Sequence, residues 1–212
     1  MRFFRSPPFA GATLIAVCAF GALSGYLFLT TIYLQDVRGY APLHAGLYTL
    51  PMAAMTAVFA PISGRLVGSR GTRLPLLLAG ASITVSMLPM TRLAPDTPDW
   101  LLLGSYLLFG FGFAMVNAPI TNTAVSGMPR AQAGVAAAIA STSRQVGGSL
   151  GVAVVGAVVA SGVRGPGGFT AASHAGWWIV VGCGAAVLGL GLATGRAAVV
   201  PAREDSTAAA NM

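Results

Sequence analysis

One cationic side chain lies deep inside an apolar stretch, and its position makes it the strongest candidate for chemistry. Arg144 lies more than two helical turns beyond the end of the loop that contains Arg130. If this stretch crosses a membrane, an arginine near its centre costs about 2.5 to 3.5 kcal/mol, so it needs snorkelling, backbone carbonyls or a polar partner. We expect Gln145, Asn117 and Asn122 to be its polar neighbours, unless another polypeptide supplies the partner.

The other polar residue types form no catalytic or metal-binding set. A membrane protease would need a serine within reach of a histidine base. The two histidines, His44 and His174, are predicted in loops at the outer helix ends, and neither cysteine has metal-ligand spacing. We therefore expect no catalytic residue, no metal, no cofactor and no enzymatic activity. The serines that lack the Gly-x-Ser-Gly setting are Ser24, Ser63 and Ser126.

The composition indicates a membrane protein. Of the 212 residues, 55% are hydrophobic and 8% are charged, and the mean hydropathy is +0.76. An ordinary soluble domain carries about 25% charged residues, so lipid must be the solvent for most of this surface. The net charge of +7 does not indicate nucleic-acid binding, because the arginines occur singly or in threes between apolar runs.

Six stretches are long enough to cross a bilayer, since a span needs about 20 apolar residues. Glycine and proline separate them. We predict an all-α, polytopic protein with one domain over residues 1–195 and a disordered cytoplasmic tail over 196–212. The predicted spans cover residues 9–34, 45–66, 74–93, 100–122, 133–161 and 175–195.

The arginines predict the orientation, because short cytoplasmic loops are enriched in positive charge. With both termini in the cytoplasm, eight arginines fall inside and three outside. The first three helices lead from the cytoplasm to the outside, and the last three lead back. The second triplet is therefore upside down relative to the first, as in the inverted repeats of secondary transporters. The inner set is Arg2, Arg5, Arg65, Arg70, Arg73, Arg130, Arg196 and Arg203, and the outer set is Arg38, Arg92 and Arg164.

The outer loop after the first span carries a motif over residues 33–47. In it, Gly39 and Pro42 predict a turn, and Gln35 with Asp36 ends the first helix in the polar interface. Gly46 is expected to let the second helix pack closely. This stretch resembles the corresponding loop in the carboxy-terminal half of the fourteen-helix drug:proton antiporter branch of the major facilitator superfamily.

Two further stretches resemble the same family. Residues 61–73 are similar to its cytoplasmic Gly-x-Leu-x-Asp latch, although Gly68 occupies the acid position, which argues against an acid-based charge relay there. Residues 117–153 are similar to the segment between the fourth and fifth helices of that half, where Ser143, Gly147 and Gly151 share one helical face. That face suits either sliding helices or simple tight packing. The latch residues are Gly64, Arg65, Arg70, Gly71 and Arg73.

The resemblance implies half of a proton-coupled multidrug efflux transporter in the cell membrane. It would export hydrophobic or cationic small molecules and would need a missing amino-terminal half or a second copy of itself. Arg144 would then either contact the opposite half across the central cavity or snorkel and anchor its helix. The alternative is an inactive truncated remnant or an assembly subunit, because the predicted spans contain no carboxylate to carry a proton. A gene fragment, a split subunit and a homodimer all stay open as its origin.

Overall fold

The computed structural model describes residues 7–125 and 133–194, and within these ranges it contains helices and no strands. Six helical stretches are long and apolar enough to cross a membrane, which confirms the six predicted spans. The sixth begins at Gly168, seven residues before the predicted start. The predicted tail, Arg130, and the arginines of both termini lie outside the described residues. The elements are α1 Pro7–Ile32, the π-helical turn η2 Tyr33–Val37, α2 Pro42–Leu47, α3 Leu50–Arg70, α4 Arg73–Met87, the 3-10 turn η3 Pro89–Arg92, α5 Asp99–Val125, α6 Ala133–Gly162 and α7 Gly168–Thr194.

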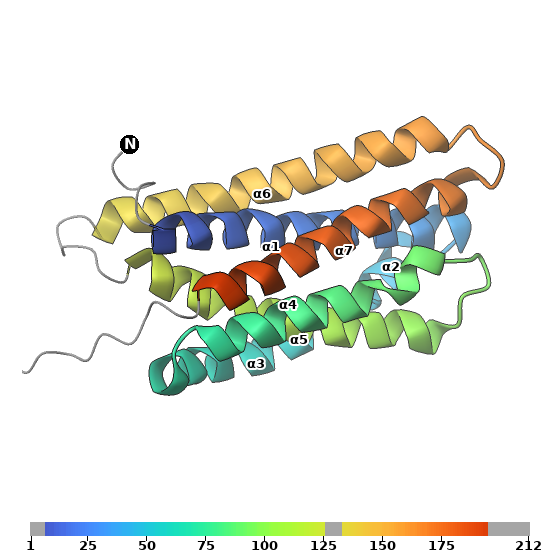
Figure 1. The fold of residues 1–212 in the computed structure, drawn as a ribbon. Coiled ribbons are helices and arrows are strands. Elements are labelled where there is room, and N and C mark those ends of the chain that lie inside the picture. Colours follow the sequence, from blue (N-terminus) through green and yellow to red (C-terminus); the bar gives the residue numbers. More distant parts are fainter. Residues whose placement is uncertain (1–6, 126–132, 195–212) are drawn as a thin grey trace, which may run out of the picture.

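The six long helices form two layers. In the first, which we call the front layer, α5 packs against α3 and α1, and α1 packs against α6. In the second, the back layer, α4 packs against α7, and the two helices cover α5 and α1 respectively. In the view of Figure 1 the back layer lies nearer the viewer, with α4 and α7 in front of α5 and α1; α6 runs along the upper edge of the bundle and α3 along the lower edge. The order across the front layer is therefore α3, α5, α1, α6.

The packing repeats with inverted symmetry. The first three spans correspond in order to the last three: α1 to α5, α3 to α6 and α4 to α7. Under this exchange the α1–α6 contact becomes the α5–α3 contact, and the α1–α7 contact becomes the α5–α4 contact. The α4–α7 contact exchanges with itself. This is the relation expected of two inverted three-helix repeats that share one core.

Glycines permit the closest approach of the two outer front-layer pairs. A Cβ atom on Gly147 of α6 would lie 2.5 Å from the Val17 carbonyl oxygen of α1, and one on Gly151 would overlap Gly21. In the second pair, a Cβ atom on Gly110 of α5 would lie 2.5 Å from the Met52 carbonyl oxygen of α3. Small residues drive such backbone contact in membranes, where lipid removes the hydrophobic force between helices.

Aromatic rings fill the half of the core toward η2, between the two layers. Tyr26 of α1 stacks on Phe109 of α5 with ring centroids 4.7 Å apart, and it meets the edge of Trp177 of α7 at 5.8 Å. The Tyr26 hydroxyl forms a 3.0 Å hydrogen bond with Ser105, so its polar atom has a partner in the apolar interior. This core fixes α1, α5 and α7 relative to one another.

Candidate functional site

Arg144 joins three helices of the front layer. From α6, its Nη2 atom donates a hydrogen bond to Thr121 Oγ1 on α5 at 2.7 Å. On the way the guanidinium crosses α1, and its Cζ lies 5.7 Å from the centroid of the Phe20 ring. The Nε atom is buried and has no hydrogen-bond partner among the described residues. The cation is thus held sideways across the layer, with part of its hydrogen-bonding capacity unused.

The hydrogen-bond partner of Arg144 is one that the sequence did not single out. Asn117 instead donates from Nδ2 to the Phe113 carbonyl of its own helix at 2.9 Å. Gln145 and Asn122 are both exposed. Arg144 reaches the Thr121 hydroxyl because of how α5 is rotated about its axis and how far it lies from α6. A single sequence does not reveal this rotation or this spacing.

Exposed polar side chains continue along the front of α6. Ser141, Gln145 and Ser149 recur every four residues, so they share one helical face, and all three are exposed. Ser143 points elsewhere: it is buried and donates from Oγ to the Ile139 carbonyl at 2.7 Å. Beside it, Gly147 forms the contact with α1 described above, so α6 separates a packing face from a polar face.

The back layer presents a different surface. Beyond Arg73 at the start of α4, every exposed residue of α4 and of residues 168–193 of α7 is apolar or glycine. Trp178 and Leu192 on α7 are examples, and Val85 is one on α4. A polar side chain that faces hydrocarbon costs free energy, whereas these residues do not. The back layer is therefore suited to lipid.

The latch motif, residues 61–73, is mostly helical. Gly64 and Arg65 lie inside α3, as in the predicted span over 45–66, and the helix continues to Arg70, four residues beyond the predicted end. The helix ends only at Gly71, whose φ of +76° is readily adopted by glycine. Isolated glycines inside a membrane helix do not break it, because no water competes for the backbone hydrogen bonds. The latch arginines Arg65, Arg70 and Arg73 are all exposed.

The outer motif forms the predicted turn. Gln35 and Asp36 lie in the π-helical turn η2, Gly39 has a φ of +68°, and Pro42 occupies the first turn of α2. The role expected for Gly46 is not met among the described residues, because a Cβ atom there would have no neighbour within 4 Å. The outer end of α2 is an exposed surface, so close helix packing is not the reason for glycine at this position.

Both histidines lie in helices, which corrects the prediction of loops. His44 belongs to α2 and stacks on Tyr40 with ring centroids 4.4 Å apart. His174 belongs to α7, where its Nε2 atom lies 2.9 Å from the Leu93 carbonyl oxygen. The predicted start of the last span was too late, and this placed His174 outside it.

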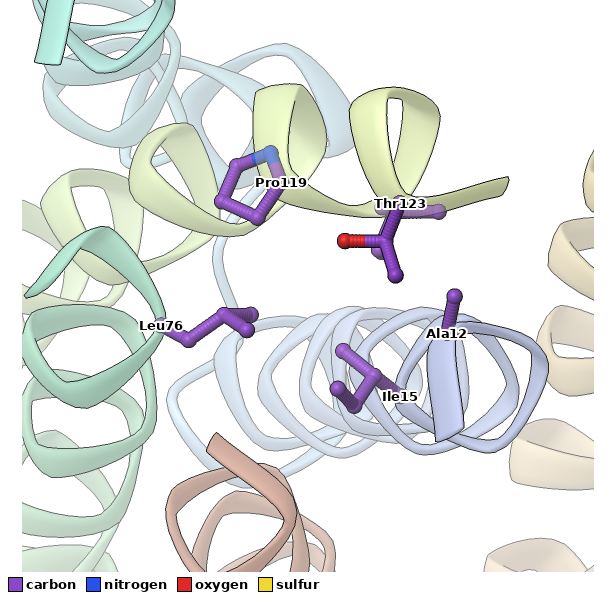
Figure 2. Close-up of a pocket in the computed structure, with 6 residues that line it drawn as sticks. Ala12, Ile15, Leu76, Pro119 and Thr123 are labelled. Atoms are coloured by element: carbon purple, nitrogen blue, oxygen red, sulfur yellow. The ribbon is translucent and has the colours of Figure 1, made fainter. Parts of the chain in front are cut away.

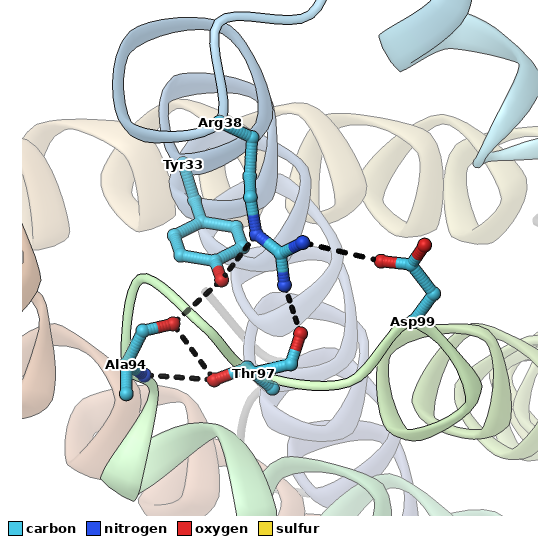
Figure 3. A network of polar contacts seen from close by, with 5 residues as sticks. All are labelled: Tyr33, Arg38, Ala94, Thr97 and Asp99. Atoms are coloured by element: carbon cyan, nitrogen blue, oxygen red, sulfur yellow. Dashed lines mark hydrogen bonds and ion pairs between the residues drawn. The ribbon is translucent and has the colours of Figure 1, made fainter.

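A polar network closes the end of the bundle at which α1 ends and α5 begins (Figure 3), and we call it the outer network after the predicted outer loop that it contains. Arg38 donates from Nε to the Tyr33 hydroxyl at 2.9 Å, forms an ion pair with Asp99 at 3.3 Å, and donates to the Thr97 carbonyl. The Tyr33 hydroxyl in turn donates to the Ala94 carbonyl at 2.6 Å. Burial lowers the pKa of Arg38, but Tyr33 and Asp99 outweigh this effect and raise it, so the cation persists at physiological pH.

A proline in α5 creates a second polar contact between helices. Pro119 has no N–H group, so the Met115 carbonyl one turn earlier lacks its helical donor. Ser63 of α3 is buried and donates from Oγ to that carbonyl at 3.0 Å. Beside Pro119 lies a small pocket between α1, α4 and α5, into which Ile15, Leu76 and Thr123 project (Figure 2). Its lining is almost entirely apolar and offers no polar set for a ligand.

Comparison with known proteins gives a family. Residues 1–152 match the family model described as Major Facilitator Superfamily. The chain is 38% identical over 161 residues to "Multidrug resistance protein Stp" of Mycobacterium tuberculosis, covering 76% of this chain and 30% of that protein. It is 37% identical over 164 residues to "Tetracenomycin C resistance and export protein" of Streptomyces glaucescens, covering 77% and 30%.

A third relative, "Puromycin resistance protein pur8" of Streptomyces alboniger, is 37% identical over 144 residues, covering 65% of this chain and 28% of that protein. The chain therefore spans less than a third of the length of these relatives. Its six apolar helices make it a multi-pass membrane protein that contacts the lipid bilayer. With the inverted packing of its two triplets and the match over residues 1–152, the chain belongs to the Major Facilitator Superfamily.

Proposed function

We propose that this chain is one half of a proton-coupled efflux transporter for hydrophobic or cationic compounds, with a second half seated against its front layer. The observation that carries this proposal is the polar face of α6. Ser141, Gln145 and Ser149 lie in mid-span and are exposed in the chain by itself. Such side chains belong against protein or water, not lipid, so the front layer requires a cover.

The relatives supply the length that such a cover needs, because more than two thirds of each lies outside the matched region. Their printed names refer to multidrug resistance and to export of tetracenomycin C, which supports the substrate class proposed here. In this arrangement Arg144 lies at the boundary between halves, and the glycine contact of α6 with α1 holds the polar face in position.

A chimeric transporter tests the proposal. The matched region of the Stp relative is replaced by this chain, and ethidium efflux is measured in cells that express the chimera or the chain alone. We expect efflux from the chimera that a proton uncoupler abolishes, and none from the chain alone. Uncoupler-sensitive efflux by the chain alone would favour a homodimer. An inserted and abundant chimera without efflux would favour a remnant or an assembly subunit.

We also propose that both termini are cytoplasmic, on the basis of the arginine distribution. Alkaline phosphatase is active only after export, so fusions report the side of each loop. A fusion after Pro98 is expected to be active and one after Gly195 silent. The reverse pattern would overturn the orientation without affecting the fold.

A further inference from the structure

The guanidinium of Arg144 is left incompletely satisfied. It carries five N–H donors in a planar fork. One hydrogen bond reaches Thr121 Oγ1, and one face of the plane lies toward the Phe20 ring. The Nε atom is buried and unpaired within the part of the chain that the structure describes. A buried donor without an acceptor costs about 1 to 3 kcal/mol, and more when the group is charged, so the structure lacks an acceptor here.

The depth of Arg144 restricts what that acceptor can be. Arg144 is eleven residues from Ala133, the first residue of α6, or about 16 Å along the helix axis at 1.5 Å per residue. The hydrocarbon core is about 30 Å thick, so this position is near its centre. A lipid phosphate would have to leave the head-group region to reach it. The hydrogen bond to Thr121 also directs the side chain across the layer toward α5.

No acidic side chain of the described residues meets this cation. The ion pair of the structure joins Arg38 to Asp99 at the outer end. Asp36 and Asp96 are also near that end, in η2 and in the turn before α5. Intramembrane arginines usually pair with acidic side chains or backbone carbonyls, and an acidic partner for Arg144 would have to come from outside the described residues.

We propose that Arg144 is a receptor for a carboxylate that approaches from the front layer. A carboxylate matches the guanidinium fork with two parallel hydrogen bonds, and the unpaired Nε belongs to one edge of that fork. The exposed amide of the neighbouring Gln145 offers a further donor. The proposal rests on the proposed function for the front layer. The carboxylate belongs either to an acidic side chain of the second half or to a transported molecule.

Chemical footprinting of the purified chain tests this directly and does not require transport. Phenylglyoxal modifies accessible guanidinium groups, and peptide mass spectrometry gives the rate at each arginine. We expect saturating benzoate to slow modification of Arg144 about tenfold, because a bound carboxylate stabilises the protonated guanidinium and covers one side of it. The neutral analogue benzamide should have no such effect. Arg164, exposed in the loop before α7, is the internal control and should react equally in both.

The outcomes separate the proposal from its alternatives. Equal rates at Arg144 with benzoate and benzamide would overturn it, as would an Arg144 that does not react in the folded chain. The Thr121→Val variant should keep the benzoate protection, because Thr121 holds a different N–H group. In the chimeric transporter, slow modification without benzoate assigns the carboxylate to the second half. Fast modification that benzoate slows assigns it to a transported molecule. The footprint is measured on the purified chain, so a chimera without efflux would count against the proposed function and leave the footprinting result unchanged.

Discussion

The fifth and sixth spans, α6 and α7, have similar compositions and different exposed surfaces. Both are long and apolar enough to cross a membrane, and both are rich in glycine and alanine. Yet α6 exposes Ser141 and Gln145 in mid-span beside apolar residues such as Leu150, whereas every exposed residue of α7 over 168–193 is apolar or glycine. Average hydropathy identifies both as membrane spans, but only the exposed residues distinguish the two environments. We infer that α6 faces protein or a water-filled cavity and that α7 faces lipid.

The largest expected effect concerns the packing face that holds α6 in place. Gly151→Val would force a side chain into the backbone of Gly21, and overpacking of this kind costs about 1 to 3 kcal/mol or more. Gly182→Val on α7 is the matched control, since its Cβ meets nothing within 4 Å. Unfolding in mixed detergent micelles, followed by circular dichroism, should show a large loss for the first variant only. Equal losses would remove the distinction between the two helices.

The next effect concerns the cation at the front layer. Arg144→Leu in the chimeric transporter should lower transport per molecule about tenfold, since about 1.4 kcal/mol of a charged contact is lost. Membrane abundance should change little. Arg92→Leu, at the exposed outer end, is the control and should retain transport. If Arg144→Leu transports normally per molecule, the arginine only anchors its helix. Arg144→Lys should then leave transport per molecule unchanged as well.

A smaller effect is expected where Ser63 compensates for Pro119. Ser63→Ala leaves the Met115 carbonyl without a donor and should cost about 1 kcal/mol of unfolding free energy. In Pro119→Ala, residue 119 regains an N–H group that can donate to the same carbonyl. The cost of Ser63→Ala should therefore shrink in the Pro119→Ala background. Additive costs in this double-mutant cycle would show that the two residues are independent.

The smallest effect is expected at the outer network. Asp99 is half exposed, so its ion pair with Arg38 is screened, and Asp99→Asn should cost less than about 1 kcal/mol. Tyr33→Phe should cost more, because Tyr33 is buried and its hydroxyl joins Arg38 to the Ala94 carbonyl. Thermal unfolding of the two variants in parallel gives the order. A larger loss for Asp99→Asn would contradict this reading of the network.

The sequence predicted the six spans because length and apolar composition suffice for a membrane helix. It misplaced helix ends where composition is ambiguous: α3 continues to Arg70, four residues beyond the predicted end, and His174 falls inside α7. The position of Arg144 within a span was also predictable. Its contact with Thr121 was not, because that contact depends on how α5 and α6 are rotated and spaced. The polar row on α6 was visible in the sequence as residues, but its exposure required the packing of α6 on α1.

The contrast between α6 and α7 is tested most directly by spin labels at matched exposed positions. In a background with both native cysteines replaced by alanine, nitroxides are placed at Gln145→Cys and at Trp178→Cys of the chimeric transporter in lipid vesicles. Collision rates with oxygen, which concentrates in the hydrocarbon, and with a water-soluble nickel complex are measured by electron paramagnetic resonance. We expect high oxygen accessibility at position 178 and low oxygen accessibility at position 145. High oxygen accessibility at both positions would place the α6 face in lipid and contradict the proposed cover over the front layer.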